Sequence, residues 1–208
     1  MFDKARAAQI FQDAALPIPA TYTIAEHKFP IIAKPRFGSA SQGIIIINSE
    51  DELSQIAPVA QQYLLQEYIP HREEITVDCY VSQSGTIIAT VPRRRIAVIG
   101  GEVSRTITID SPEIISLSRQ TLSSLNLRGA VTIQFIHDTD SGRILLMEIN
   151  PRLGGGVVCS IHAGANFPHY ILAEALNQPI SPLPSYLTNL EITRYQQEIT
   201  FHNGILIK

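Results

Sequence analysis

The chain has 208 residues, of which 45% are apolar, and its 16 basic and 19 acidic residues give a net charge of −3. This length is enough to bury a hydrophobic core as one domain or as two small lobes. The weak charge gives no reason to expect nucleic acid or a membrane surface as a partner, and the apolar runs are too short to cross a bilayer. Two cysteines in unlike contexts, Cys79 and Cys159, and no signal peptide indicate a reduced, cytoplasmic protein.

The first residues predict an amphipathic helix. Asp3 is suited to cap it, Ile10 and Phe11 lie on its apolar side, and Pro17 and Pro19 end it. Short strands are expected next, and they span 21–24, 29–35 and 43–48.

A capping box at Ser49 and Glu52 predicts a helix over 50–56, and Pro58 either stops this helix or begins a second short one. An apolar segment follows at 63–69, and further strands are expected at 73–82, 85–95, 130–137 and 143–150.

Two more helices are expected, one from Ser111–Pro112 to just before Gly129 and one over 169–176, followed by a strand-rich tail. Because the strands come as hairpins with helices interspersed, the sequence predicts an α+β fold rather than a doubly wound parallel sheet.

Oxygen-bearing side chains follow the last two predicted strands before residue 151. If 130–137 and 143–150 pair about Ser141, Gln134 lies opposite Glu148, and Asn150 shares the face of Glu148 because strand side chains repeat every two residues. Mg²⁺ prefers oxygen ligands and often takes only one or two protein carboxylates. The hairpin therefore indicates a magnesium site, with a solvated sheet face as the alternative.

A second feature is Lys34, which ends an apolar strand and is followed by the Gly/Ser loop of residues 38–43. Small residues let a backbone approach a polyphosphate and direct N–H groups at it, and a lysine adds a compact positive charge. The glycines follow the lysine, so the loop is not a Walker A motif. A mobile hairpin tip with an exposed lysine is the alternative.

A third feature is the segment LLQEYIPHREE, whose main chain is placed to meet an adenine edge and whose Glu74 is placed to reach ribose hydroxyls. On the residues alone, both Glu67 and Glu74 are better interpreted as surface side chains.

Together these segments resemble the ATP-grasp superfamily, in the branch of the carbamoyl-phosphate synthase large subunit and biotin carboxylase. The resemblance covers nearly the whole chain. It rests on five segments in order, which are DK at 3–4, FPIIAKP with its Gly/Ser loop, QEYI with Glu74, VTIQF and MEINPR.

The resemblance implies a nucleotide held between two α+β lobes. It divides the ATP-grasp domain 1–208 into an N-terminal helix and linker (1–20), a small lid lobe (21–66) and a larger lobe with the metal site (67–208). The residues it implies for ATP binding are Lys4 and Lys34 on the phosphates, Gly38, Ser39, Ser41 and Gly43 in the closing loop, Gln66, Glu67, Tyr68 and Ile69 at the adenine, and Glu74 on the ribose.

For the chemistry, the resemblance implies that Gln134, Glu148 and Asn150 ligate one or two Mg²⁺ ions, with Mn²⁺ as the alternative metal. Arg152 would face the reacting carboxylate and the γ-phosphate, and Lys34 and Arg95 complete the expected catalytic set. Arg93 shares a strand face with Arg95. We expect a functional role for at least one of the two, with solvated edge charges as the alternative.

The implied activity is that of an ATP-dependent ligase, which activates a small carboxylate as an acyl phosphate for attack by an amine. Two other functions stay open, a module that binds Mg-ATP without completing ligation and a carboxylate or carbamate kinase. Relatives usually carry a preceding Rossmann-like domain, which we expect this chain to lack and a homodimer or a partner to supply.

Two further features stay open. The segment 152–167 is either an anion-binding turn for an acceptor carboxylate or a connecting loop, and His162 and His169 are interpreted as ordinary polar residues.

Overall fold

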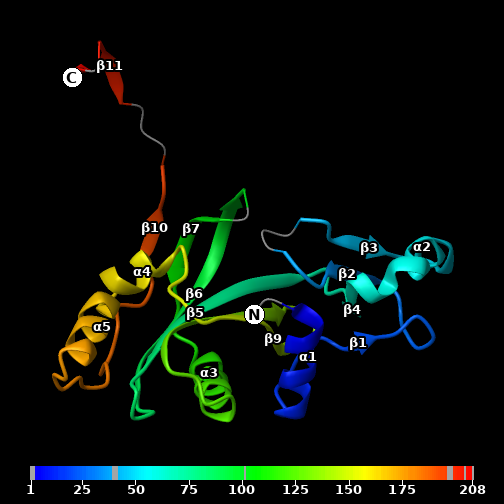
Figure 1. The fold of residues 1–208 in the computed structure, drawn as a ribbon, viewed down its shortest axis with the longest axis horizontal. Helices are drawn as coiled ribbons and strands as arrows, with labels where there is room; N and C mark the ends of the chain where they lie inside the picture. Colours follow the sequence, from blue (N-terminus) through cyan, green and yellow to red (C-terminus); the bar gives the residue numbers. More distant parts are fainter. Residues whose placement is uncertain (1–2, 39–41, 101, 196–198, 204, 208) are drawn as a thin grey trace.

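The computed structural model describes residues 3–38, 42–100, 102–195, 199–203 and 205–207, so Ser39 and Ser41 of the expected phosphate loop lie outside the described residues. Within these ranges the chain forms a small lobe around a four-stranded sheet, a larger lobe around a six-stranded sheet, and a final two-stranded hairpin. Figure 1 shows the small lobe on the right and the larger lobe in the centre and on the left. All the strand pairs described are antiparallel, which confirms the α+β prediction.

The small lobe has the strand order β1-β4-β2-β3. Its elements are β1 (Thr21–Tyr22), β2 (Ile31–Pro35), β3 (Ile45–Ile47), α2 (Glu50–Ile56), the 3-10 helix η1 (Ala57–Gln62) and β4 (Tyr63–Glu67). Ser49 caps α2 as expected, while the Glu52 carboxylate accepts from the amide of Asn48, one residue earlier than in the standard capping box. Pro58 begins η1.

The larger lobe has the strand order β10-β7-β6-β5-β8-β9. Its strands are β5 (Arg72–Val81), β6 (Ile87–Ile99), β7 (Glu102–Thr108), β8 (Gly129–Asp138), β9 (Ile144–Asn150) and β10 (Glu191–Thr193). The segment that forms β7 was not predicted as a strand. Because β7 pairs with β6, the strand that carries Arg93 and Arg95 is an interior strand rather than an edge.

Side chains of β5 alternate between two faces of the large sheet. Ile75, Val77 and Cys79 point into a core that the helices α1 (Lys4–Asp13) and α3 (Pro112–Ser124) cover from below in Figure 1. The alternate residues Glu74 and Asp78 belong to a polar face, which continues onto β6, β8 and β9 through the strand register. At the far end of that face, α4 (Val157–His162) and α5 (Phe167–Ala175) cover a second core.

The helix ends follow local signals. Asp3 caps α1 by accepting from the amides of Ala5 and Arg6. The helix α3 stops earlier than predicted, because Asn126 adopts a left-handed conformation with φ of 50°, and Gly129 instead begins β8. The helix α4 was not predicted.

The chain ends in the predicted strand-rich tail, with β11 (Thr200–His202) and β12 (Ile205–Ile207) extending away from both lobes in Figure 1. Among the helices described, none is long and apolar enough to span a membrane.

Candidate active site

A cleft of about 310 Å³ lies between the two lobes, lined by β2 and β4 on one side and by α1 and the polar face of the large sheet on the other. It gathers most of the residues selected from the sequence, namely Lys4, Lys34, Gly38, Gln66, Glu67, Tyr68, Ile69, Glu74, Arg95, Gln134, Glu148, Asn150 and Arg152. Gly43 does not line it. Gly43 has a φ of 71°, and a Cβ there would lie 3.0 Å from Cγ of Pro35.

Three oxygen-bearing side chains meet on one wall of the cleft. The predicted hairpin is present, with Gln134 opposite Glu148 and Thr132 opposite Asn150. Within the part of the chain that the structure describes, the side chains of Gln134, Glu148 and Asn150 make no hydrogen bond or ion pair. Their oxygen atoms are therefore available to a ligand in the cleft.

This set of donors fits Mg²⁺. Among the described residues there is no group of three or more His, Cys, Asp or Glu side chains arranged to hold a metal, so a site built wholly from such ligands is not present there. Mg²⁺ needs no such group, because it usually keeps several waters and binds through one or two carboxylates together with substrate phosphates. Glu148 supplies one carboxylate, and two amide oxygens lie on the same wall.

Lys34 reaches the cleft from β2 and is not the exposed hairpin tip that was the alternative. The residue is 9% exposed, and its Nζ donates to Oε1 of Gln66 at 2.9 Å. Burial, followed by the nearby charge of Arg72, lowers the pKa of Lys34 from 10.5 to about 8. Gln66 therefore contributes its side chain to the cleft, besides the main chain that was expected to read adenine.

Lys4 lies against the start of the Gly/Ser loop. Its Nζ donates to the carbonyl of Gly38 at 2.8 Å, and its amide donates to the carbonyl of Arg36 at 2.9 Å. The Arg36 guanidinium donates to Asp3, with Nε 3.1 Å from Oδ1, and this hydrogen bond is the main cause that lowers the pKa of Asp3 to about 2. These contacts fasten the first residues of the loop to the N-terminus of α1.

The segment after β4 borders the cleft through its main chain. The amide of Tyr68 donates to the carbonyl of Pro30 at 3.1 Å and is therefore already used. The amide of Ile69 makes no hydrogen bond to another described residue. Apolar side chains from both lobes line the cleft, and they include Ile32 and Ile44 of the small lobe and Ile136 and Met147 of the larger lobe.

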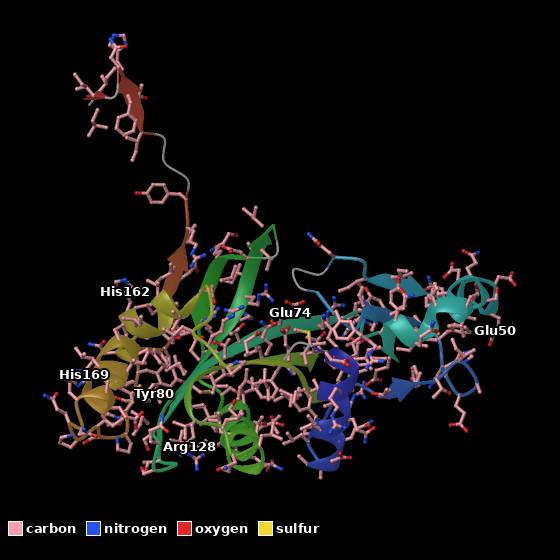
Figure 2. The ribbon with its side chains drawn as sticks, in the orientation of Figure 1. Glu50, Glu74, Tyr80, Arg128, His162 and His169 are labelled. Atoms are coloured by element: carbon pink, nitrogen blue, oxygen red, sulfur yellow. The ribbon has the colours of Figure 1, made fainter. Side chains whose placement is uncertain are left out.

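Glu67 and Glu74 both line the cleft, and both are ion-paired. The carboxylate of Glu67 accepts from Arg143 at 3.0 Å and from the amide of Ala20 at 3.2 Å. Glu74 lies between the lobes in Figure 2, and its Oε2 accepts from Arg95 at 2.7 Å. Arg93 lies on the same strand face but is 2% exposed and pairs with Asp78, so it is not the solvated edge charge that was the alternative.

Residues 59–198 match the family described as "ATP-grasp in the biosynthetic pathway with Ter operon". The chain belongs to the ATP-grasp family. Among curated proteins it is similar to the carbamoyl phosphate synthase large chain of Bifidobacterium longum, with 26% identity over 169 residues, or 73% of this chain and 15% of that protein.

Solved structures share the fold. Biotin carboxylase from Campylobacter jejuni has a TM-score of 0.79 with 18% identity, over 92% of this chain and 49% of that one. The biotin carboxylase domain of Hydrogenobacter thermophilus 2-oxoglutarate carboxylase has a TM-score of 0.74 with 19% identity, over 91% and 48%. The ATP-grasp fold expected from the sequence is thus confirmed, and the chain spans about half the length of these solved chains.

Sequence reasoning missed one cation of this ATP-grasp cleft, Arg72. Its guanidinium lies over the ring of Tyr68, 5.4 Å from the centroid, and its Nη1 donates to the carbonyl of Ile69 at 2.7 Å. The available signal was its position on β5 two residues before Glu74, which places both side chains on the cleft face.

Arg152 and three glycines follow β9. Arg152 is exposed and lines the cleft, and its Nη1 donates to the carbonyl of Leu153 at 3.0 Å. Gly154, Gly155 and Gly156 form the turn that leads into α4 and are not among the residues that line the cleft. His162 and His169 are exposed and lie on α4 and α5, far from the small lobe in Figure 2.

Proposed function

We propose that this ATP-grasp chain is the nucleotide-binding and phosphoryl-transfer part of an ATP- and Mg²⁺-dependent ligase, which activates a small carboxylate as an acyl phosphate for attack by an amine. One observation carries the proposal. Cationic side chains from both lobes line the same cleft as the oxygen donors of Gln134, Glu148 and Asn150, which have no partner within the described residues. Such a cleft suits a polyphosphate with a divalent cation at its tail.

In this proposal the nucleotide lies along the cleft with its base between the apolar side chains of the two lobes. The amide of Ile69, which has no acceptor among the described residues, would be the main-chain donor for the adenine edge, since that of Tyr68 is used. Glu74 would contact the ribose. Lys4 and Lys34 take the phosphates, and the low pKa of Lys34 supports this role because a phosphate would supply the counter-charge that its neutral partner Gln66 lacks.

When bound, Mg²⁺ would supply charge neutralisation at the phosphates. Gln134, Glu148 and Asn150 are the residues that would hold it. Arg152 and Arg95 would orient the carboxylate beside the γ-phosphate, although Arg95 also neutralises Glu74. Positioning and neutralisation are what phosphoryl transfer chiefly requires from a protein.

The proposed reaction has two steps. An oxygen of the substrate carboxylate attacks the γ-phosphorus, and the bond between that phosphorus and the bridging oxygen of ADP breaks. The amine then attacks the carbonyl carbon of the acyl phosphate, the bond between that carbon and the phosphate oxygen breaks, and inorganic phosphate leaves with its electrons and takes up the proton that the nitrogen loses.

The relatives support this proposal without identifying the substrates. The Hydrogenobacter thermophilus structure is described as a dimer in complex with MgADP, ADP and bicarbonate. By analogy we propose Mg²⁺ and ATP for this chain, and a small acid and an amine as its other substrates. Because the chain spans about half of the solved relatives, a second candidate is a module that binds Mg-ATP but ligates only with residues from outside this chain.

Calorimetric titration with ATP, in the presence and absence of Mg²⁺, tests the nucleotide site. We expect Mg²⁺ to strengthen ATP binding, Lys34→Met to impair it strongly, and Lys28→Met, at an exposed position outside the cleft, to leave it unchanged. Absence of ATP binding by the folded wild-type protein would contradict both candidates. ADP release across a panel of amino acids and small carboxylates then separates them, because binding without release under any condition favours the module.

A further inference from the structure

Arg93 is the most deeply buried cation of the described larger lobe, and it has no place in the proposed reaction. Its side chain is 2% exposed, and its Nε donates to Oδ2 of Asp78 at 2.8 Å. Ser160 of α4 donates to the same Asp78 oxygen at 2.7 Å. Buried ion pairs are weak evidence for stability, because their desolvation offsets much of their attraction, so a role in fixing geometry is the better explanation.

The other side of the guanidinium lies against the glycine turn. A Cβ at Gly156 would come within 2.5 Å of Nη1 and 2.7 Å of Cζ of Arg93, and within 2.7 Å of Val103. A Cβ at Gly154 would come within 3.4 Å of Nη2. Nη1 is buried and has no hydrogen-bond partner among the described residues. The guanidinium of Arg93 thus packs directly against the turn of residues 154–156.

Glycine at position 156 is required by space rather than by backbone conformation. Its φ of −94° and ψ of 5° are open to any residue. Arg93 has no freedom to move aside, because Asp78 holds it and its surroundings are closed. Gly155 differs, since a Cβ there would meet nothing within 4 Å.

The turn is connected to the reacting end of the cleft through a short path. Thr132 donates to the carbonyl of Arg152 at 2.9 Å, and the same Thr132 would lie 3.1 Å from a Cβ at Gly154. Arg152 donates through its own amide to the carbonyl of Asn150 at 2.8 Å. A displacement of the turn would therefore reach Arg152 through Gly154, which is two residues from Arg152 along the chain and shares the contact with Thr132.

From these contacts we infer that Arg93 is a positioning residue, which acts through the Gly154–Gly156 turn to aim Arg152 at the terminal phosphate of the nucleotide. This inference rests on the proposed function. It explains why a buried arginine stands under two glycines whose conformations do not require glycine.

The test compares Mg²⁺-dependent binding of ADP with that of a nonhydrolysable ATP analogue, because the two nucleotides differ at the phosphate that Arg152 would meet. We expect the wild-type protein to bind the analogue at least about tenfold more tightly than ADP, and Arg152→Ala to lose most of that preference. Gly156→Ala should resemble Arg152→Ala in this ratio while its affinity for ADP stays within about threefold of wild type. Gly155→Ala, the matched control, should resemble wild type in both.

Each remaining outcome decides the matter. If Gly156→Ala keeps the wild-type ratio, or loses affinity for both nucleotides in equal measure, the role of Arg93 is only structural and the inference is overturned while the proposed function stands. If wild type binds neither nucleotide, the proposed function fails and this inference fails with it. If Gly156→Ala does not fold, Arg93→Lys decides, since it keeps the charge beside Asp78 but lacks the planar guanidinium. Loss of the ratio with ADP binding retained supports the inference, and an unchanged ratio overturns it.

Discussion

Gln134 lies directly opposite Glu148, while its neighbour Phe135 lies opposite Leu146, so Met147 is an extra residue in β9. This bulge breaks the alternation of the strand. Leu146 and Ile149 are buried members of the core, although both also border the cleft. Met147 and Glu148 are half-buried and line the cleft side by side. In a regular strand Glu148 would fall opposite Ile133 and face the core. The bulge thus places an apolar wall and a carboxylate side by side in the cleft.

The carboxylate of Glu148 is expected to carry the metal dependence of nucleotide binding. Glu148→Gln keeps the shape of the side chain but removes its charge, so the gain in ATP affinity on adding Mg²⁺ should fall at least about tenfold. Binding of ATP without metal should stay within about twofold of wild type. Calorimetric titration at several Mg²⁺ concentrations measures both quantities, and an unchanged response to Mg²⁺ would exclude Glu148 as a ligand.

Met147 is expected to contribute to binding of the nucleotide base and not to binding of the metal ion. Met147→Ala removes an apolar contact from the cleft wall, which should cost roughly 1 kcal/mol, or about fivefold in nucleotide affinity. The relative gain on adding Mg²⁺ should be the same as in wild type. Parallel titrations of Met147→Ala and Glu148→Gln would therefore give opposite patterns, and a shared pattern would argue against the division of roles along β9.

Lys34 is expected to lower the stability of the folded protein near neutral pH. Its pKa falls from 10.5 to about 8 on folding, a difference that corresponds to roughly 3 kcal/mol. Between these two values the unfolded chain holds the proton and the folded chain does not, so the stability of the wild-type protein rises with pH across this window. Below pH 8 the lysine is charged in both states, and its burial cost is fully present.

Lys34→Met should therefore be more stable than wild type at pH 7, by less than the full difference because Gln66 loses its partner. This advantage should shrink as the pH rises from 8 toward 10.5. Denaturant unfolding of both proteins at pH 7 and pH 10 measures it, and the other titrating groups cancel in the comparison. A variant that is less stable than wild type at pH 7 would show that the Lys34–Gln66 hydrogen bond outweighs the desolvation of the charge.

The sequence was sufficient for features that depend on local spacing. The capping of α1 by Asp3 follows from residue type, and the hairpin itself follows from two apolar segments around one turn. Pairing about Ser141 predicted the Gln134–Glu148 pair correctly, but the register next to the turn differs by one residue, and the bulge at Met147, which was not predicted, restores that pair. The gathering of the cleft residues was reached only through the resemblance to ATP-grasp proteins. On periodicity alone, Glu67 and Glu74 were indistinguishable from surface residues.

What the sequence did not reveal depends on contacts between distant segments. Asp78 accepts from both Arg93 and Ser160, and Ser160 lies 82 positions further along the chain, so no local pattern could connect them. The requirement for glycine at position 156 is equally non-local. Its φ is ordinary, and only the folded structure shows that the Arg93 side chain occupies the space where a Cβ would lie.

The pairing of Asp3 with Arg36 is expected to be visible in the titration of Asp3. Arg36 is the main cause that lowers the pKa of Asp3 from 3.8 to about 2, so Arg36→Met should return it toward 3.8. Folded-state stability gained from Asp3 is present above its unfolded pKa and is lost as the pH falls through the folded value. Because Arg36→Met brings the folded pKa toward the unfolded value, the stability lost to acid through Asp3 should be smaller in the variant.

Side-chain carboxyl resonances followed by NMR between pH 1.5 and 6 give the pKa directly. Asp138 is the matched control, because Ser141 and Arg143 lower its pKa to about 2 without help from Arg36, so its titration should be the same in both proteins. An Asp3 that still titrates near pH 2 in Arg36→Met would mean that the amides of Ala5 and Arg6 alone stabilise its charge. The start of the Gly/Ser loop would then be held to α1 by Lys4 rather than by the ion pair.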